Sequence, residues 1–426
     1  MPLGYRDTVA LRVLHVSTYA GNGGAGRAAS SLHQAMVDEG VESRMLTASG
    51  TRFRITSELD RRMWSLQRSP RVTWRSPARF GCLTAQQINA SAADVVNLHW
   101  VTDGFLSVEQ IGRITKPIVW TMHDMWPFTG TEHYTFTGSR TEAHPHEDGQ
   151  PPRWVEGYTR DNRPGDESGW DLDRWTWERK RRSWVRPPHL IPVSSWLGGL
   201  AGQSALARNW PTTVIPNVMP IQTFAPQDKS EVRRQLGLPA STSLIAFTAS
   251  AGIGDDRKGW RHLRDALPVV RRRFPDVGVI VIGPHHDHDD PGIDIPIHWQ
   301  GEIQDDARMA QLIAAADVVA VPSEMDNLPM TACEAQTAGR PVVAFDVGGL
   351  PDIVTHLTTG YLARAYDVTD LADGLSQALD EARTGARWGA AARTNAQSRW
   401  SAAAVVDQYL RVYEQAVSGF GGDRGR

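Results

Sequence analysis

The sequence predicts an α/β protein with two doubly wound domains, each built on a parallel sheet that helices cover on both faces. Two observations predict this class. Short apolar, β-rich runs alternate along the chain with amphipathic helical patterns, an arrangement typical of parallel sheets with both faces buried. In addition, 426 residues are too many for one ordinary core, and Pro, Asn and Gln cluster at 211–226, between two sets of apolar runs. We therefore expect domains over 1–213 and 214–398, facing each other across a cleft.

The predicted strands and helices follow one another in a regular order. In the first half the strand-like runs are Leu11–Ser17, Ser43–Thr47, Val95–Trp100, Ile118–His123 and Leu190–Ser194. In the second half they are Leu244–Thr248, Val277–Ile282, Val318–Pro322 and Val342–Phe345. The helical patterns between them include Ala28–Asp38, Val108–Ile114, Arg261–Arg273, Asp306–Ala315 and Asp370–Arg383. A terminal segment over 399–426 carries one more helix, Ala402–Val417, for which the N-terminal domain is one candidate packing partner.

Composition excludes several classes of protein. The 45 Lys and Arg against 48 Asp and Glu leave a net charge of −3, so no overall basic field marks a nucleic-acid binder. Two cysteines, Cys82 and Cys333, exclude a disulfide scaffold and a Cys-rich zinc site, and they suit a reducing compartment. No apolar run approaches the roughly 18 residues of a membrane span, and Asp7 and Arg12 interrupt the start where a signal peptide needs an apolar core. We expect a cytoplasmic protein, with peripheral contact at the inner membrane face as one alternative.

One stretch, about 129–173, breaks the alternation of strands and helices. It is polar, rich in Gly, Pro and His, and without strand or helix periodicity. A loop of this length inside a compact domain is either functional or disordered. Trp154 and Trp170 within it argue against plain disorder, which is poor in aromatic residues. A substrate-facing lid and a floppy insertion both remain open.

Two glycine-rich turns each lie between a predicted strand and a predicted helix. Gly21, Gly23 and Gly26 fit the G-x-G-x-x-G spacing that brings backbone amides and a helix N-terminus close to a phosphate. The next strand, however, ends without the acidic residue that a nicotinamide site uses on the ribose. Two interpretations of this turn remain: it faces an anion without a ribose clamp, or it is a tight turn that binds no ligand. A matching turn carries Gly348 and Gly349, and the two turns together are able to bracket a diphosphate.

The most informative segment is 322–335, where two carboxylates follow a buried strand. Asp326 falls in the turn after the strand, and Glu334 lies eight positions later inside the helix 331–337. Ligands of open α/β sheets bind at the carboxyl ends of the strands, so both acids are candidates for holding sugar hydroxyls. The alternative is an ordinary helix start with acids in its first turns.

With these residues in view, the chain resembles a retaining glycosyltransferase of GT-B fold, of the family 4 type. That family carries a carboxylate, seven residues and a Glu in its C-terminal domain; Asp326 matches the first acid, which is usually Glu, and Glu334 the second. Further matches fall in order at Gly23–Arg27, Asn97–Trp100, Thr121–Gly130, Ser194–Leu197, Ile215–Asn217, Arg257–Gly259, Gly301–Ile303 and Val347–Gly349. The matches at 97–100 and 121–130 resemble the subgroup of exopolysaccharide and colanic-acid assembly. The resemblance runs from about Leu11 to Val417.

The resemblance implies a fold and an activity. Two Rossmann-like domains are implied, an N-terminal one that binds the acceptor and a C-terminal one that binds the nucleotide sugar. The implied enzyme is a retaining, metal-independent transferase of hexosyl type, with a nucleotide-diphosphate sugar as co-substrate and no separate cofactor. A glycan, glycolipid or other lipid-linked molecule, or small natural product would be the acceptor, with no nucleic acid partner. Two alternatives are a nucleotide-sugar epimerase of GT-B fold and a non-catalytic nucleotide-sugar binding protein.

Roles for individual residues follow from the resemblance and from charge. The leaving diphosphate gains negative charge as its bond to the sugar breaks, and a fixed Lys258 would stabilise that charge without a metal. The candidate catalytic residues are His123, Asp124, Lys258 and Asp326. The candidate donor-binding residues are Gly23, Gly24, Arg257, Lys258, Ile303, Asn327, Leu328, Met330, Glu334, Gly348 and Gly349. The candidate acceptor-binding residues are Trp126 and Trp154, as rings that stack on sugar faces. No metal ligands are predicted.

The chain departs from the resembling family in two places, and one basic run allows two interpretations. Ala251–Gly254 stands where many relatives carry an Arg before the Lys, so Lys258 with Arg257 or the main chain is expected to clamp the phosphate. The segment after the His-Asp-Met-Trp-Pro motif has His133, His144 and His146 where relatives often have Cys, which favours solvated loop residues over a zinc knuckle. The basic run 179–182 favours a solvated helix face over contact with an anionic acceptor or a membrane.

Overall fold

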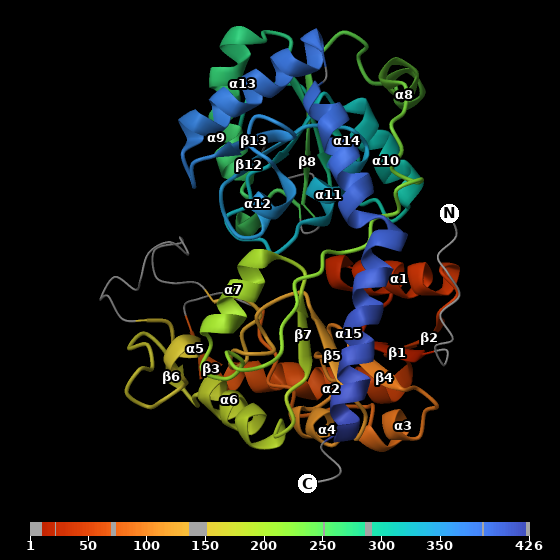
Figure 1. Cartoon of the computed structure of the whole chain (residues 1–426). Coiled ribbons are helices and arrows are strands. Elements are labelled where there is room, and N and C mark those ends of the chain that lie inside the picture. Colours follow the sequence, from red (N-terminus) through yellow and green to blue (C-terminus); the bar gives the residue numbers. More distant parts are fainter. Residues whose placement is uncertain are drawn as a thin grey trace. The chain divides into compact units, whose positions relative to one another are not determined.

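The computed structural model describes residues 11–21, 23–69, 74–135, 151–249, 252–285, 292–385 and 387–422. The chain forms two compact units: unit 1 comprises Met1–Val218 with Val405–Arg426, and unit 2 comprises Met219–Ala404. Each unit has one large parallel sheet with helices packed against it (Figure 1). The α/β class with parallel sheets, predicted from the alternation of apolar runs and helical patterns, is therefore confirmed.

The main sheet of unit 1 has five strands in the order β2-β1-β4-β5-β7, and all of its neighbouring pairs are parallel. Its strands are β1 (Arg12–Ser17), β2 (Glu42–Thr47), β4 (Val95–Leu98), β5 (Ile118–Met122) and β7 (His189–Pro192). Each of the central strands β1, β4 and β5 is almost entirely buried because helices cover both faces. The five runs predicted in the first half of the sequence are these five strands.

The helices of unit 1 form two layers on this sheet. They are α1 (Gly23–Asp38), α2 (Gly50–Arg62), η1 (Met63–Leu66), α3 (Ala85–Asn89), α4 (Val108–Gly112), α5 (Arg153–Glu156), α6 (Leu172–Ser183), α7 (Ser195–Gln203) and α15 (Ala402–Gly422). On one face Met36 of α1 contacts His15, and Tyr413 of α15 accepts a hydrogen bond from Asn97 of β4. On the other face α3, α4, α6 and α7 pack on an apolar core that is rich in tryptophan.

The sheet of unit 2 has six strands in the order β10-β9-β8-β11-β12-β13, again all parallel. The strands are β8 (Leu244–Thr248), β9 (Gly278–Ile282), β10 (Ile297–Trp299), β11 (Val318–Val321), β12 (Val342–Phe345) and β13 (Gly360–Ala363). The helices are α8 (Lys229–Leu236), η2 (Asp256–Lys258), α9 (Trp260–Arg273), α10 (Asp306–Ala315), α11 (Met330–Thr337), α12 (Leu350–Ile353), α13 (Val368–Thr384) and α14 (Arg387–Trp400). Figure 1 shows α9 and α13 on one side of the sheet and α10, α11 and α14 on the other.

Local sequence explains where several helices begin. The side chains of Asp228, Asp305 and Asp367 each accept a hydrogen bond from a backbone N–H in the first turn of α8, α10 and α13. Such caps satisfy amides that have no partner inside the helix, and an acid there also faces the positive end of the helix dipole. At the other end of α8, Gly237 adopts φ +67°, a conformation that ends a helix at little cost for glycine.

The sequence did not predict four short strands. The central strand of unit 2, β8, is four-fifths apolar and buried, whereas β10 (Ile297–Trp299) carries His298 and is only half-buried. At the other edge, β13 begins at Gly360, whose Cβ, if present, would lie 2.1 Å from the carbonyl oxygen of Val342. Such edge strands lack a continuous apolar run because they are not buried on all sides. The remaining two, β3 (Gln67–Arg68) and β6 (Ser168–Gly169), form an antiparallel pair.

The described parts of the stretch predicted as irregular are folded onto unit 1. Trp154 and Tyr158 are buried, and Arg153 forms an ion pair with Asp171 at 2.7 Å. Residues 129–135 and parts of 151–173 are therefore packed on unit 1, and α6 begins at Leu172 within the predicted limits. The part from 136 to 150, with His144 and His146, lies outside the described residues. In the part of the chain that is described, no helix is long and apolar enough to cross a membrane.

Candidate active site

In unit 2, two cations converge on the first carboxylate of the predicted motif. Lys258 Nζ lies 2.7 Å from Asp326 Oδ2, and Arg257 Nη1 lies 3.3 Å from the same oxygen. Burial would raise the pKa of Asp326, but the charges of Lys258 and Arg257 outweigh it and hold the pKa below its ordinary value. Asp326 is therefore a carboxylate at neutral pH, and it fixes the positions of both cations.

The backbone brings these residues together although they are far apart in sequence. The turn 255–259 follows β8 and the loop 322–327 follows β11, and the two strands are neighbours. The backbone N–H of Glu324 donates to the carbonyl oxygen of Arg257 at 2.9 Å. Gly259 has φ +75°, and a Cβ there would lie 1.9 Å from the carbonyl oxygen of Pro322. Only glycine permits this close approach, which places Lys258 beside Asp326.

The second glycine turn closes on the same loop. Gly349 N–H donates to the carbonyl oxygen of Asp326 at 2.9 Å. Gly348 has φ +56°, and a Cβ at this position would lie 2.2 Å from that oxygen. Turns after β8, β11 and β12 thus meet at the carboxyl ends of three adjacent strands, which is where ligands of open α/β sheets bind.

The other predicted donor residues of unit 2 lie around this meeting point. Glu334 is 1% exposed on α11, just over one turn after the helix begins at Met330. The backbone N–H of Asn327 faces the Asp326 carboxylate and contributes to its lowered pKa. Leu328 is buried in the same loop, and Ile303 is half-buried in the loop after β10. A 2.7 Å contact between the hydroxyls of Thr248 and Thr331 joins the end of β8 to the start of α11.

Glu324 is a carboxylate of this region that the sequence analysis did not predict. Glu324 is 5% exposed, and its carboxylate contacts Arg261 and, at 3.0 Å, His262 Nε2. Its carbonyl oxygen also accepts the hydroxyl of Tyr366 at 2.9 Å. Glu324 therefore holds the start of α9 against the loop that carries Asp326. The signal that would have found it is its place two positions before Asp326, on the same buried loop.

In unit 1, Asp124 is an internal anchor of the turn that follows β5. Its Oδ1 accepts the backbone N–H of Trp126 at 2.9 Å. Its Oδ2 accepts Trp100 Nε1 at 3.0 Å and His133 Nδ1 at 2.6 Å. Burial would raise the pKa of Asp124, but His133 and the Trp126 amide hold it below its ordinary value. Asp124 positions its neighbours through these bonds.

His123 lies beside Asp124 and lines a small hollow of unit 1. The same hollow is lined by His99, Trp100, Asp124 and His133. His123 Nε2 is 3.3 Å from His99 Nδ1. Burial lowers the pKa of His123 to about 4, although the Asp124 carboxylate opposes this shift. His123 is therefore a neutral imidazole near pH 7.

Lys180, a buried residue of the basic run 179–182, holds the turn that follows β5. Lys180 of α6 is fully buried, and its ammonium donates to the carbonyl oxygens of Trp126, Thr129 at 3.2 Å and Gly130 at 2.8 Å. Burial lowers the pKa of Lys180 well below its ordinary value. The favoured interpretation of 179–182 as a solvated helix face is wrong for Lys180 and for Arg179, which is buried and paired with Glu109. No sequence signal separates these two from the exposed residues of the run.

The structure also corrects the predicted acceptor residues. Trp126 is 2% exposed, its Nε1 donates to Ser76 O at 2.8 Å, and the Lys180 ammonium lies 3.7 Å from its ring centre. Trp154 is 5% exposed and packs edge-on against Phe128. Both rings are too deeply buried in the tryptophan-rich core of unit 1 to stack on a sugar. Burial of a large aromatic ring is the commoner outcome for such residues.

His133 is likewise not a solvated loop residue. It is 3% exposed, and beside its bond to Asp124 its Nε2 lies 2.8 Å from Ser76 Oγ. The predicted phosphate-facing glycines of unit 1, Gly23 and Gly24, are exposed at the beginning of α1, which is the first helix after β1. Together they place backbone amides at a helix N-terminus.

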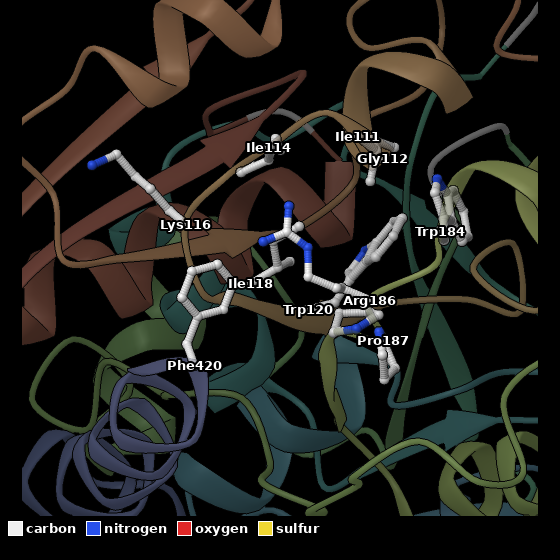
Figure 2. A pocket seen from close by; sticks show the side chains of 11 residues that line it. Ile111, Gly112, Ile114, Lys116, Ile118, Trp120, Trp184, Arg186, Pro187 and Phe420 are labelled. Carbon is white, nitrogen blue, oxygen red and sulfur yellow. The ribbon is translucent and has the colours of Figure 1, made fainter. Parts of the chain in front are cut away.

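A separate hollow of unit 1 lies near the beginnings of β5 and β7, at the end of β5 opposite to His123. Figure 2 shows apolar side chains around it, with Lys116 and Arg186 among them. The guanidinium of Arg186 lies 5.2 Å from the ring centre of Phe420 of α15. None of the residues predicted for catalysis or binding lines this hollow.

The chain is similar to known glycosyltransferases. Residues 243–381 match the family model for glycosyl transferases group 1. This segment lies within unit 2 and contains Lys258, Asp326 and Glu334. D-inositol 3-phosphate glycosyltransferase of Mycobacteroides abscessus is 32% identical over 215 residues, which cover 47% of this chain and 45% of that protein.

The name of a second curated relative states its donor. The GDP-mannose-dependent monoacylated alpha-(1-6)-phosphatidylinositol monomannoside mannosyltransferase of Corynebacterium glutamicum is 30% identical over 204 residues, or 44% of this chain and 52% of that protein. The chain thus spans about half the length of the curated relatives it matches.

Solved structures match over nearly the whole chain. Sucrose-phosphate synthase of Thermosynechococcus elongatus has a TM-score of 0.64 at 16% identity and covers 96% of this chain and 100% of its own. HepE of Anabaena, in complex with UDP and glucose, has a TM-score of 0.60 at 17% identity and covers 95% and 99%. At such identities the likeness is one of fold, and the GT-B fold implied by the motifs is confirmed.

Proposed function

We propose that this protein is a retaining glycosyltransferase that moves a sugar from a nucleotide-diphosphate sugar to a hydroxyl of an acceptor. One observation carries the proposal. Lys258 and Arg257 converge on Asp326 at the carboxyl ends of β8 and β11, within the segment that matches the glycosyl transferase model. A pair of fixed cations at this end of a parallel sheet suits a diphosphate.

In the proposed reaction the bond from the anomeric carbon to the diphosphate oxygen breaks, and the acceptor oxygen bonds to that carbon. The nucleoside diphosphate leaves with the electron pair, and the hydroxyl proton is released with it. Negative charge therefore grows on the leaving group as the bond lengthens. Lys258 stabilises this charge, and Asp326 holds the ammonium in place beforehand, so little reorganisation is needed during the reaction. A fixed cation in this position does the work that a metal does in other transferases.

We assign Glu334 to the donor rather than to the breaking bond. It lies on α11, beyond the turn that carries Asp326. A carboxylate at this place suits the two vicinal hydroxyls of a ribose, which are the same in the bound donor and in the transition state. Asn327, Leu328, Met330, Ile303, Gly348 and Gly349 are assigned to the same donor site, and Gly23 and Gly24 of unit 1 to the diphosphate.

Unit 1 is proposed to bind the acceptor, with His123 touching a hydroxyl of the donor sugar. Since Trp126 and Trp154 are buried, a different ring is needed to stack on an acceptor sugar. Trp74 is 52% exposed, and its ring lies edge-on to Trp100, which follows β4. Trp74 is therefore the proposed stacking residue. The motifs at 97–100 and 121–130 favour an acceptor of exopolysaccharide, glycolipid or natural-product type.

A thermal-shift panel of nucleoside diphosphates and nucleotide sugars tests the proposal and finds the donor base. A ligand at 100 times its dissociation constant stabilises the folded protein by about 2.7 kcal/mol. We expect stabilisation by one nucleoside diphosphate and its sugar, reduced in Lys258→Ala. Slow hydrolysis of that sugar without acceptor would support the transferase. An epimer formed from the sugar alone would instead identify an epimerase, and tight binding without any turnover would identify a binding protein.

A further inference from the structure

Three histidine rings form a continuous contact chain across the sheet of unit 1. His15 lies in β1, His99 directly follows β4, and His123 directly follows β5, which are three adjacent strands. His15 Nδ1 is 2.9 Å from His99 Nε2, and His99 Nδ1 is 3.3 Å from His123 Nε2. The rings of neighbouring members are nearly parallel, with interplanar angles of 24° and 21°. We call His15, His99 and His123 the histidine chain.

The inner end of the histidine chain meets a methionine sulfur. His15 Nε2 lies 3.3 Å from Sδ of Met36, and both residues are fully buried. The hydroxyl of Tyr413 also reaches this sulfur, at 4.0 Å, while it accepts Asn97 Nδ2 at 2.8 Å. A thioether has no proton to give and is able only to accept. The sulfur therefore lies between two donors.

The Met36 sulfur sets the direction of each hydrogen bond in the histidine chain. Each neutral imidazole carries one N–H and one lone pair. If His15 donates from Nε2 to Met36, its Nδ1 is an acceptor and receives the N–H of His99 Nε2. His99 Nδ1 is then an acceptor in turn and receives the N–H of His123 Nε2. In the reverse direction, a lone pair on His15 Nε2 would face the sulfur lone pairs in a buried site, which costs free energy.

The rings are neutral in this environment, as the direction requires. Burial lowers the pKa of His15 to about 3 and that of His123 to about 4, and it lowers the pKa of His99 as well. His33, whose ring centre is 5.7 Å from that of His15, lowers the pKa of His15 further, whereas the Asp124 carboxylate acts in the opposite sense on His123. In this direction, a proton added to Nδ1 of His15 or of His99 would face the N–H of the next ring at an N···N contact.

We propose that Met36, His15 and His99 are positioning residues that hold His123 in the neutral tautomer with its proton on Nε2, so that Nδ1 is the hydrogen-bond acceptor of the ring. His123 then accepts a hydrogen bond from a hydroxyl of the bound sugar and does not donate one or act as an acid. The sugar contact rests on the proposed function, whereas the tautomer rests on the contacts within unit 1 alone.

The first test measures the tautomer directly. The full chain is labelled with ¹⁵N-histidine, and long-range ¹H–¹⁵N correlation spectra are recorded near neutral pH. The signals of His123 are those that vanish in His123→Gln. We expect Nε2 to be protonated and Nδ1 to be unprotonated. A proton on Nδ1 alone, or on both nitrogens, would overturn the proposal, and this result needs no substrate and no activity.

The second test removes the acceptor at the inner end. Met36→Leu keeps a buried apolar side chain of similar volume but takes away the sulfur. We expect a second tautomer of His123 to appear and the donor KM to rise several-fold, with a smaller change in kcat. Met219→Leu, a buried methionine of unit 2, is the matched control and should change neither. An unchanged His123 spectrum in folded Met36→Leu would show that the sulfur does not set the direction. If the protein proved inactive with every donor, the proposed function would fail, whereas the result on the His123 tautomer would stand.

Discussion

The carboxyl group of Glu132 makes the stability of unit 1 depend on pH in a way that one substitution should remove. Tyr158 Oη donates to its two oxygens at 3.1 and 3.2 Å. Burial and the neighbouring Asp173 carboxylate raise the pKa of Glu132 to about 8 from an ordinary value of 4.5. The folded protein therefore retains a proton that the unfolded chain loses at a much lower pH.

The sign and size of the effect follow from this difference. Because the folded-state pKa is the higher one, the contribution of Glu132 is fully present below pH 4.5 and is lost as pH rises to about 8. Within that window the free energy of unfolding falls by about 1.4 kcal/mol per pH unit. From about pH 5 to about pH 8 the loss is roughly 4 kcal/mol. Glu132→Gln cannot titrate, so its stability relative to the native protein should rise by this amount over the same range.

Urea unfolding at several pH values measures the effect. Most of the 16 Trp residues lie in unit 1, so tryptophan fluorescence reports its unfolding. Glu156→Gln, an exposed acid of the nearby helix α5, is the matched control and should track the native protein at every pH. A constant difference in stability between Glu132→Gln and the native protein across the range would refute the reasoning.

Four further predictions concern the proposed donor site. Glu334→Gln should raise the donor KM with little change in kcat, because ribose contacts are alike in the ground and transition states; a native KM in a folded variant would show that the donor site is misplaced. Lys258→Ala should lower kcat by about 10²–10³, the loss typical of one preorganised charge-stabilising donor, and Asp326→Asn should lower kcat in the same sense; steady-state kinetics that change only KM would argue against both. Excess chelator should leave the rate unchanged, and a rate lost in chelator and restored by magnesium or manganese would contradict the role of Lys258. Gly348→Ala should lower Tm and donor affinity because its Cβ meets the Asp326 carbonyl, whereas Gly301→Ala, with φ +69° and open space around it, should show only the roughly 1 kcal/mol cost of a left-handed alanine.

Local sequence patterns predict much of the fold. The run Val318–Pro322 is apolar throughout and became the buried strand β11, and Asp306–Ala315 became α10 with the predicted limits. The reason is that a strand buried on both faces needs every side chain to be apolar, and a helix on its face needs apolar residues every three or four positions. Edge strands such as β10 escape this rule because part of their surface is not covered.

The candidate donor site was predicted in part for a similar reason. The sequence predicts Asp326 and Glu334 because acids after a buried strand fall at the end of the sheet where ligands bind. Which residues surround these two acids is known only from the tertiary structure. Lys258 is 68 positions from Asp326, and their 2.7 Å contact depends on the order of β8 and β11 in the sheet.

The sequence by itself determined which segments are strands and helices and which loops carry carboxylates, glycines and lysine, because these are properties of residues close together in the chain. Only the tertiary structure decided which polar groups are buried together. Whole strands and helices separate His15, His99 and His123 in the sequence. Their rings are nevertheless in contact because the strands that carry or precede them are neighbours in the parallel sheet. Lys180 lies in a run of charged residues like its neighbours, and only the direction in which α6 faces the core buries it beneath Trp126. Sequence spacing fixes neighbours along a helix or strand, whereas contacts between elements depend on how those elements pack.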